Sequence, residues 1–371
     1  MELLSPAGNK EAFDAAIACG ADAVYLGYTA FGARSYAGNF DEEGLGEAIA
    51  CAHELDRKVY VTVNTLVKEK ELKDLHRVLG ILTKLHADAV LVQDLGVVKL
   101  ILEQYPELCL HASTQMTVHN RQGAQMLKSL GFSRVVPARE CSLEEIGRIA
   151  SAGIETEVFG HGALCVCVSG QCLFSSMVGG RSGNRGKCAQ PCRMPYRMNG
   201  GKEGFFLSPK DLMLLDSIPQ LLQAGVTSLK LEGRMKRPEY VAAVTRAYRR
   251  AIDAAEAGRE FVIDDDLREE ILQIFNRGSF THGYLLHENH AALMSPDHAS
   301  HFGVPVGTIT RVDRLYVTLK TQKPLHPTDS LQIRLDRDWD FSYNGKEAAP
   351  GDPVSQNARI VKANNYGIIR K

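Results

Sequence analysis

The chain has 371 residues, of which 44% are hydrophobic and 23% charged, and its formal net charge is −1. A chain of this size can bury one large core and a smaller second one, and a charge so near zero argues against a general binder of polyanions. No run of about 18 apolar residues and no basic-then-apolar leader occurs, so we expect neither membrane span nor signal peptide and predict a cytoplasmic protein.

Short β-rich apolar runs alternate with longer segments of helical periodicity through the first two thirds of the chain. This alternation is typical of parallel strands joined by crossover helices. We predict an α/β fold, a TIM-like (β/α)8 barrel, with a doubly wound open sheet as the alternative. The predicted strands are Glu2–Ser5, Ala23–Gly27, Lys58–Asn64, Ala89–Gln93, Cys109–Ser113, Arg134–Ala138, Glu155–Gly160 and Ser228–Glu232, and the predicted helices include Glu42–Glu54, Glu71–His86, Arg121–Leu130, Ser142–Ala152, Asp211–Ala224 and Pro238–Ala255.

The pattern changes after the last of these helices. An acidic helix is predicted at Asp264–Phe275, and short alternating strands follow it. We predict a barrel over 1–258 with a Cys-rich loop at 161–208, a helical connection over 259–303, and a small β-barrel domain over 304–371. The strands predicted in that last domain are Val306–Val312, Arg314–Thr321, Ser330–Arg334 and Pro353–Arg359.

In a barrel, catalytic side chains lie at the carboxyl ends of strands and in the loops that follow them. Four residues at such positions are candidates for catalysis: His161 and Glu232 as proton carriers, and Arg139 and Arg234 as anion clamps. Polar residues also end ordinary strands as helix caps, so each of these positions has that plainer reading as well.

The long loop after the seventh predicted strand contains a cluster of cysteines. Cys165, Cys172, Cys188 and Cys192 have the spacing C-x6-C-x15-C-x3-C, with Cys167 as an alternative in the first pair. A reducing cytosol disfavours disulfides, and converging thiolates suit zinc or an iron-sulfur cluster. The spacing lacks the C-x2-C pairs common in structural zinc sites, but zinc and no metal at all stay open. The other four cysteines, Cys19, Cys51, Cys109 and Cys141, are expected to be small buried side chains.

Positive charge is concentrated in and after this loop. Between Arg181 and Arg237 there are eleven Lys or Arg and four acidic residues, a net charge of +7. Such a segment can bind RNA phosphates or other anions, or it can be a flexible solvated loop. The residues that we predict for RNA or anion binding are Arg181, Arg185, Lys187, Arg193, Lys236 and Arg237.

The segment Glu157–Ser175, E-V-F-G-H-G-A-L-C-V-C-V-S-G-Q-C-L-F-S, resembles the defining motif of the U32 peptidase family. G-K-C-A-Q-P-C-R at Gly186–Arg193 and K-L-E-G-R-M-K at Lys230–Lys236 support the resemblance. Better-understood members resemble RNA hydroxylation factors that modify a uridine of tRNA or a cytidine of ribosomal RNA. The resemblance implies a four-iron four-sulfur cluster held by the four cysteines, and prephenate as a small-molecule hydroxyl donor.

Two other functions stay open at this stage. A collagenase-like peptidase could pair Cys165 or Cys167 with His161 or His111, although no local cysteine-protease motif and no H-E-x-x-H accompany them. The chain could also be a non-catalytic factor that binds RNA or a partner protein through its basic face. A pocket beside the cysteines would favour catalysis over this third reading.

Overall fold

The computed structural model describes residues 1–201, 203–288, 290–312, 317–322, 324–325, 331–334 and 359–362. It divides into two compact units. The first comprises Met1–Pro191, Asp211–Ile263 and Thr281–Leu293, and the second comprises Cys192–Lys210, Asp264–Phe280 and Met294–Lys371.

Eight parallel strands of the first unit form a closed barrel. Successive strands pair in chain order, and β11 pairs with both β1 and β7, which closes the sheet on itself. The predicted barrel is therefore confirmed and the open-sheet alternative is wrong. The barrel strands are β1 (Glu2–Pro6), β2 (Ala23–Gly27), β3 (Lys58–Val63), β4 (Ala89–Val92), β5 (Leu110–Ala112), β6 (Arg134–Val135), β7 (Glu155–Ala163) and β11 (Ser228–Leu231).

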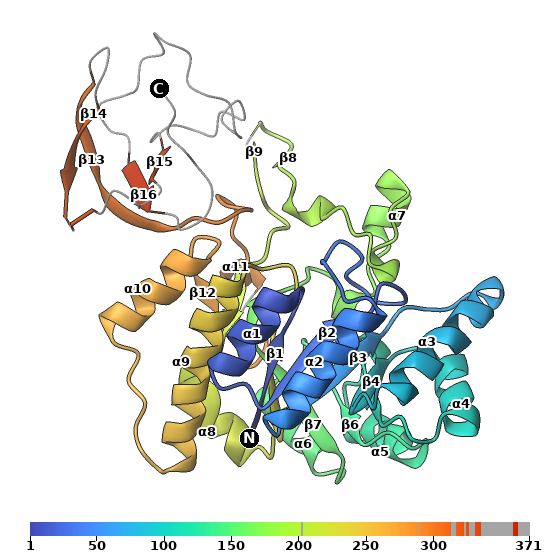
Figure 1. Cartoon of the computed structure of the whole chain (residues 1–371). Helices are drawn as coiled ribbons and strands as arrows, with labels where there is room; N and C mark the ends of the chain where they lie inside the picture. Colours follow the sequence, from blue (N-terminus) through green and yellow to red (C-terminus); the bar gives the residue numbers. More distant parts are fainter. Residues whose placement is uncertain are drawn as a thin grey trace. The chain divides into compact units, whose positions relative to one another are not determined.

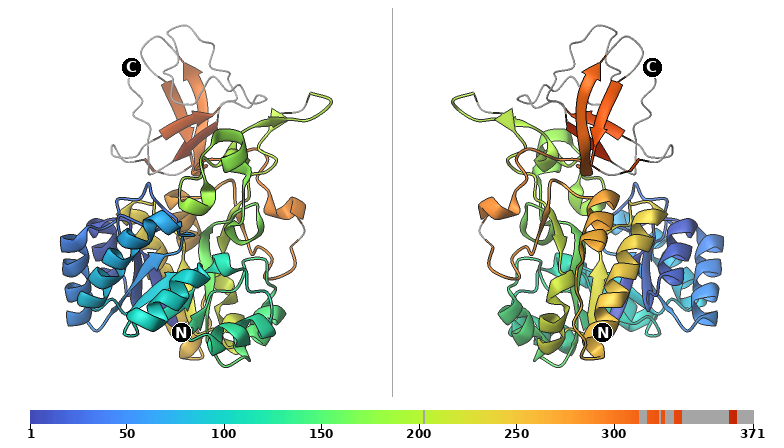
Figure 2. Two further views of the ribbon diagram at one scale, coloured as in Figure 1. Left: turned by 90° about the vertical axis from the view of Figure 1, so that its right-hand side faces the viewer. Right: turned by 90° about the vertical axis from the view of Figure 1, so that its left-hand side faces the viewer.

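Helices surround these strands (Figures 1 and 2). Several begin where a polar side chain just after a strand accepts hydrogen bonds from the first helical turn, as Asn9, Asp94 and Ser142 do. Asp94 therefore caps a helix, as polar residues that follow a strand often do. The helices are α1 (Lys10–Ala18), α2 (Glu42–Glu54), α3 (Leu72–Lys84), α4 (Leu95–Gln104), α5 (Arg121–Ser129), α6 (Leu143–Ala150), α8 (Ile218–Gln223) and α9 (Pro238–Glu256).

The helix predicted over Asp211–Ala224 is wrong in its first half. Residues Asp211–Met213 form a strand, β10, which pairs antiparallel with the last residues of β7. β7 runs nine residues and extends past its pairing with β11, so its end offers unpaired backbone groups that β10 satisfies. A 3₁₀ turn at Leu215–Ser217 and the short α8 follow.

The remaining elements lie in the cysteine loop and toward the C-terminus. In the second unit, four strands form an antiparallel sheet in the order β14-β13-β16-β15. Most of the strand predicted at Pro353–Arg359 falls outside the described residues, whereas the predicted acidic helix is present as α10. These elements are α7 (Phe174–Gly179), β8 (Tyr196–Arg197), β9 (Glu203–Gly204), α10 (Asp265–Ile274), β12 (Phe280–Thr281), α11 (His290–Leu293), β13 (Val304–Val312), β14 (Val317–Thr321), β15 (Leu331–Arg334) and β16 (Arg359–Lys362).

Among the described residues, no helix combines the length and the apolar character that crossing a membrane requires.

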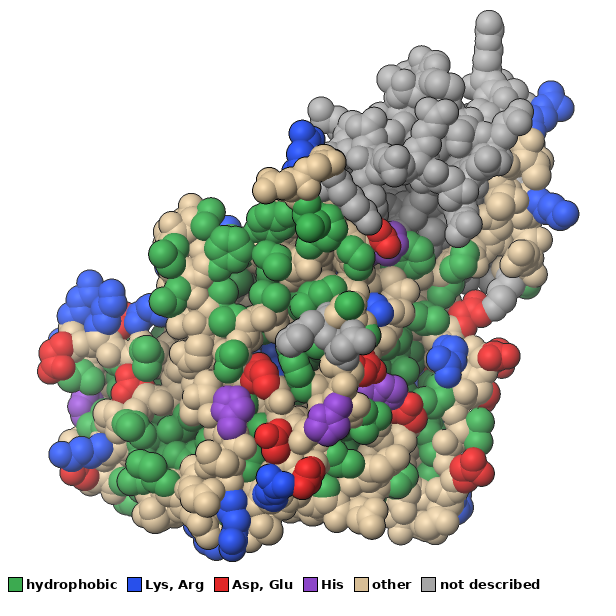
Figure 3. All heavy atoms as spheres, turned by 180° about the vertical axis from the view of Figure 1, so that it is seen from behind, with side chains coloured by type: hydrophobic (Ala, Val, Ile, Leu, Met, Phe, Trp, Pro, Cys, Tyr) green, Lys and Arg blue, Asp and Glu red, His purple; other side chains and the backbone are tan. Residues whose placement is uncertain are grey.

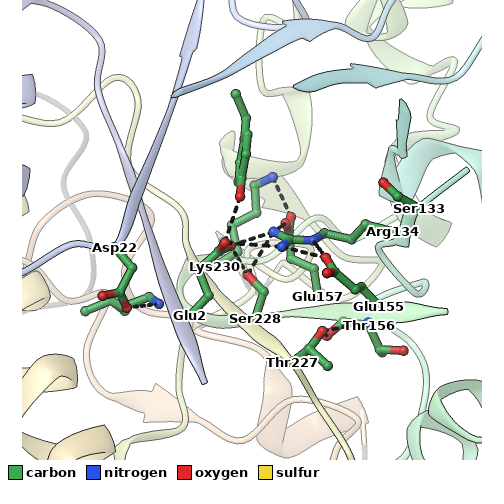
Figure 4. Close-up of polar contacts among 12 residues, drawn as sticks. Glu2, Asp22, Ser133, Arg134, Glu155, Thr156, Glu157, Thr227, Ser228 and Lys230 are labelled. Atoms are coloured by element: carbon green, nitrogen blue, oxygen red, sulfur yellow. Dashed lines mark hydrogen bonds and ion pairs between the residues drawn. The ribbon is translucent and has the colours of Figure 1, made fainter. Parts of the chain in front are cut away.

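The barrel interior holds a network of buried charges near the strand starts (Figure 4). Arg134 on β6 pairs with Glu2 at 2.5 Å, Glu155 at 2.8 Å and Glu157 at 3.2 Å. Glu157, whose side chain is 0% exposed, also pairs with Lys230 at 2.8 Å. Charges removed from water must be paired to be tolerated, and here one carboxylate serves two cations. The network therefore joins β1, β6, β7 and β11 across the barrel.

We predict that Glu157→Gln lowers the free energy of unfolding by about 3 kcal/mol or more, because Arg134 and Lys230 lose a buried counter-charge. Glu155→Gln is the matched control, since Glu155 meets the same arginine but is 52% exposed, and it should cost less than about 1 kcal/mol. Urea unfolding of both variants checks this. Equal losses in the two variants would contradict it.

Candidate active site

Glu232 and a group of arginines meet at the carboxyl end of the barrel strands. Glu232 follows β11, Arg34 comes from the loop after β2, and Arg139 comes from the loop after β6. Arg34 Nη2 lies 3.2 Å from one carboxylate oxygen of Glu232, and Arg139 Nη2 lies 3.8 Å from the other. Barrel closure thus gathers residues that are nearly 200 positions apart in the chain, as the 198-residue separation of Arg34 and Glu232 shows.

Arg234 completes the cluster from two residues beyond Glu232. Its guanidinium donates to Thr62 Oγ1 at 2.5 Å and to the Arg34 carbonyl and Asn39 Oδ1 at 3.3 Å each. The residue is only 3% exposed. A Cβ at Gly27 would lie 2.6 Å from Asn39 Oδ1 and 2.9 Å from the Arg234 guanidinium, so only glycine leaves room for this arrangement.

Charge in this cluster is unbalanced, with three guanidinium groups around one carboxylate. Burial raises the pKa of Glu232, but Arg34, Arg139 and Arg234 outweigh it and hold the pKa below its usual value, so the carboxylate is ionised at neutral pH. Burial, and then the charge of Arg34, lower the pKa of Arg234 to about 10. The cluster thus carries excess positive charge in a poorly hydrated place, which favours binding of an anion.

Two buried donors in this cluster have no hydrogen-bond partner in the part of the chain that the structure describes. They are the Nε atoms of Arg139 and Arg234. Buried polar groups are nearly always hydrogen-bonded, so such atoms call for an explanation. Arg139 is also packed against the Phe159 ring, 4.0 Å from the guanidinium carbon to the ring centre, which holds it in place. We interpret these atoms as donors available to a bound molecule.

The cysteine loop is anchored to the loops around this cluster. Glu140 accepts hydrogen bonds from the Ser169 amide at 2.8 Å and from its hydroxyl at 2.6 Å. Ser169 has φ 37° and ψ 41°, a left-handed conformation that a serine keeps only when its surroundings hold it. Farther along the loop, Arg185 pairs with Glu71 at 2.5 Å. The loop is therefore docked on the barrel at separate points.

Four cysteines of this loop belong to the first unit and lie near one another: Cys165, Cys167, Cys172 and Cys188. Burial, and then the Cys172 and Cys165 thiols, raise the pKa of Cys167. A Cβ at Gly183 would lie 3.8 Å from Cys188 Sγ and 3.7 Å from the Cys172 carbonyl oxygen, so these two cysteines approach the same glycine. Cys165 is also among the groups whose electrostatic interaction with Arg34 raises the pKa of that arginine, after the larger effect of Glu232. The thiols thus adjoin the arginine cluster.

The chemistry of the donor set fits a thiophilic centre. The Phe174 amide donates to Cys172 Sγ at 3.4 Å, and the Gln190 amide donates to Cys188 Sγ at 3.3 Å. Amide donors to sulfur tune metal-bound thiolates. The fourth predicted ligand, Cys192, belongs to the second unit, in the 3₁₀ turn Pro191–Arg193. Within the described residues no group of three or more His, Cys, Asp or Glu is already arranged as a metal site, so the four-cysteine centre stays a prediction.

His161 packs against tyrosines of α9. The pairing of β7 with β11 shifts by one residue between Lys230 and Leu231, and after this bulge His161 packs on α9. Its Nδ1 lies 3.4 Å from the Tyr248 hydroxyl, and the residue is 1% exposed. Burial lowers its pKa to about 4, so the imidazole is neutral at pH 7. Its surroundings are those of a packed core residue, and its catalytic role stays a prediction.

The predicted anion-binding residues differ in their surroundings. Arg185 is paired with Glu71, and Arg193 donates to Ser208 at 2.7 Å, so protein groups already engage both. Arg181, Lys187 and Arg237 are exposed, and the Lys236 ammonium lies 5.4 Å from the centre of the Tyr240 ring. On the face drawn in Figure 3, the described Lys and Arg side chains stand in small groups among Asp and Glu, without forming one continuous basic surface.

Sequence reasoning missed Arg34. It lies seven residues after the end of β2, inside the following loop, whereas the predicted candidates lie within a few residues of a predicted strand end. The glycines that flank it, Gly32 and Gly38, gave a usable signal, because they allow a loop to approach other backbone closely.

The chain matches one family model and is similar to several known proteins. The family model for peptidase family U32 matches residues 8–295. The chain is 36% identical over 358 residues to a 23S rRNA 5-hydroxycytidine synthase of Escherichia coli, which covers 91% of this chain and 53% of that protein. It is 39% identical over 294 residues to a tRNA hydroxylation protein of Bacillus subtilis, covering 76% of this chain and 70% of that one. An uncharacterized protease of Methanocaldococcus jannaschii is 37% identical over 308 residues, with 78% and 75% covered. The chain thus spans about half the length of the first of these relatives and most of the other two.

We predict that Gly27→Ala lowers the free energy of unfolding by about 1–3 kcal/mol, because the added methyl group collides with Asn39 and Arg234. Gly80→Ala on α3 is the matched control. Nothing lies within 4 Å of a Cβ at that position, and alanine in a helix interior should stabilise by up to about 1 kcal/mol. Thermal unfolding of both variants checks this prediction. An unchanged free energy of unfolding in Gly27→Ala would contradict the packing described for Arg234.

Proposed function

The chain belongs to peptidase family U32, and on that premise we propose that it is an iron-sulfur enzyme that hydroxylates a nucleotide of tRNA or 23S rRNA. The observation that carries the proposal is the excess of guanidinium groups around Glu232 at the barrel mouth, beside the cysteine loop. Catalytic groups of barrel enzymes collect at this end. The names of the Escherichia coli and Bacillus subtilis relatives support RNA as the substrate, and an RNA substrate fits a cytoplasmic protein.

Cys165, Cys172, Cys188 and Cys192 are proposed to hold a four-iron four-sulfur cluster, with zinc as the alternative. A bound cluster would supply one-electron transfer. The amide donors to Cys172 and Cys188 support thiolate ligands at these positions. Cys167 stands outside this ligand set and is expected to be dispensable for the metal.

The arginine cluster is proposed to bind a small anionic hydroxyl donor, for which prephenate, a dicarboxylate, is the candidate that the family resemblance suggests. The side chain of Arg139 is 13% exposed and Arg234 is 3% exposed, so a compact carboxylate can reach them more readily than the phosphates of a large RNA. The orphaned Nε atoms would donate to such a carboxylate. Ionised Glu232 can then accept a proton from the bound molecule.

A peptidase is the second candidate, because one relative is named as a protease. The described site favours it less. A thiol nucleophile is activated by a lowered pKa and a nearby histidine, whereas the pKa of Cys167 is raised. The candidate His111 is 3% exposed inside the barrel, and His161 packs on α9. A non-catalytic RNA-binding factor is favoured less, because it would not explain the unpaired donors of Arg139 and Arg234, which are too buried to meet RNA directly.

The proposed function is tested by metal analysis and RNA analysis together. Protein purified without oxygen should contain about four irons and four sulfides per chain, as a four-cysteine cluster requires. The double variant Cys188→Ala, Cys192→Ala should lose them, while Cys167→Ala should keep them. In a deletion strain, one hydroxylated nucleotide should disappear from total RNA and return with the wild-type gene. Zinc in place of iron, or an unchanged nucleotide profile, would overturn the proposal.

We further predict that Arg139→Lys lowers the hydroxylated fraction of the target nucleotide by about tenfold or more, because lysine keeps the charge but lacks the planar fork that holds a carboxylate. Arg148→Lys on α6 is the matched control, since Arg148 is 64% exposed and pairs only with Glu144 at the surface. Mass spectrometry of RNA from complemented strains measures both. A normal hydroxylated fraction with Arg139→Lys would remove this arginine from the site.

A further inference from the structure

Tyr36 is an exposed aromatic side chain at the rim of the barrel mouth. It follows Arg34 by two residues in the loop after β2. Its side chain is 56% exposed, and among the described Phe and Tyr residues it is the only one in the exposed class. The Arg181 guanidinium lies over its ring, 5.2 Å from the ring centre. An exposed ring paired with an arginine thus stands beside the arginine cluster.

Neighbouring contacts hold both members of this pair. Arg181 Nε donates to the Lys187 carbonyl at 3.1 Å, and the Ser35 hydroxyl donates to the Gly186 carbonyl at 2.8 Å. Gly186 has φ +78°, and a Cβ there would lie 2.8 Å from the Gly32 carbonyl oxygen. The cysteine loop and the loop after β2 are therefore in close contact on either side of Tyr36. The ring and the guanidinium lose little conformational entropy when a ligand stacks on them.

Charge around the ring favours a polyanion. Arg181 and Lys187 are both exposed, whereas Arg185 pairs with Glu71 and Arg34 pairs with Glu232. An aromatic face beside positive charge is the usual means by which proteins bind an unpaired nucleotide, because every base has a face that stacks and every linkage carries a phosphate. A protein partner would fit the exposed apolar side chains of the neighbouring α7 better, such as Met177 at 83% exposure.

We propose that Tyr36 and Arg181 form a stacking platform for an unpaired base of the RNA substrate, next to the nucleotide that is modified. The proposal rests on the proposed function, since it names how that same substrate is held. Tyr36 is a positioning residue here: it binds a neighbouring base and takes no part in the reaction at the barrel mouth. It predicts that the substrate presents a loop or single-stranded segment.

The test uses the full-length chain and two fluorescently labelled probes, a twelve-nucleotide oligouridine RNA and an abasic ribose-phosphate oligomer of equal length. Wild type should bind the oligouridine about tenfold more tightly than the abasic oligomer. That ratio of dissociation constants is what stacking of one base contributes. Tyr36→Ala should abolish this preference, and Tyr36→Phe should retain it. Leu55→Ala is the matched control, since Leu55 is 51% exposed but lies at the C-cap of α2, the opposite end of the barrel.

A spectroscopic readout separates stacking from a structural role. The chain contains one tryptophan, so Tyr36→Trp adds a second reporter at the platform. Its fluorescence should be quenched by oligouridine and not by the abasic oligomer, relative to wild type. Arg181→Ala should weaken binding of both probes and reduce the salt slope by about one, whereas Tyr36→Ala should leave the slope unchanged.

Three results would overturn the platform: wild type binds both probes equally, wild type binds neither, or Tyr36→Ala keeps the preference while remaining folded by circular dichroism. Equal binding combined with self-association that depends on Tyr36 would assign the surface to a protein contact instead. Normal hydroxylation of cellular RNA without any base preference would remove the platform and leave the proposed function intact. A base preference in a protein that carries no iron would remove the proposed chemistry and leave the platform intact.

Discussion

Positive charge inside the barrel has to be balanced, because an unpaired buried cation costs several kcal/mol. Near the strand starts the balance is complete: Glu157 lies between Arg134 and Lys230, and Glu2 and Glu155 add further carboxylates. Near the strand ends Glu232 is the carboxylate that meets Arg34 and Arg139, while Arg234 is held by neutral oxygens. Buried cations are thus paired with carboxylates at one end of the barrel, and the positive charge in excess at the other end is available to a ligand.

The cysteine loop depends on the same geometry. It leaves β7 at the mouth and is fixed to loops that follow other strands, through Ser169 on Glu140 and Arg185 on Glu71. Cys165 consequently lies close enough to Arg34 to interact with it electrostatically. Cys165, the arginine cluster and the exposed ring of Tyr36 therefore lie at the same end of the barrel, on segments that are distant in the chain.

The sequence was sufficient to predict the barrel, because parallel strands buried on both faces read as short apolar runs at regular intervals. It was not sufficient where a residue's surroundings depend on distant backbone. The Asp211–Met213 segment has helical periodicity but pairs with the free end of β7. His161 sits at a strand end in the sequence, yet a one-residue bulge turns it onto α9. Arg34 reaches Glu232 only because the barrel closes. Spacing and motif resemblance make the cysteines candidate ligands, which stays a prediction, and spacing alone could not give their mutual arrangement.

The points at which the cysteine loop is anchored have a consequence for biogenesis. They are polar contacts between loops, such as the Ser35 hydroxyl on the Gly186 carbonyl, the buried Ser169 on Glu140 and the ion pair of Arg185 with Glu71. Segments held by few contacts near solvent open locally at far lower free energy than the whole domain unfolds. We therefore expect the loop to open at a lower free energy than the barrel unfolds. If the cysteines hold a metal centre as proposed, that centre could then be inserted after the charged interior has formed and without disturbing it.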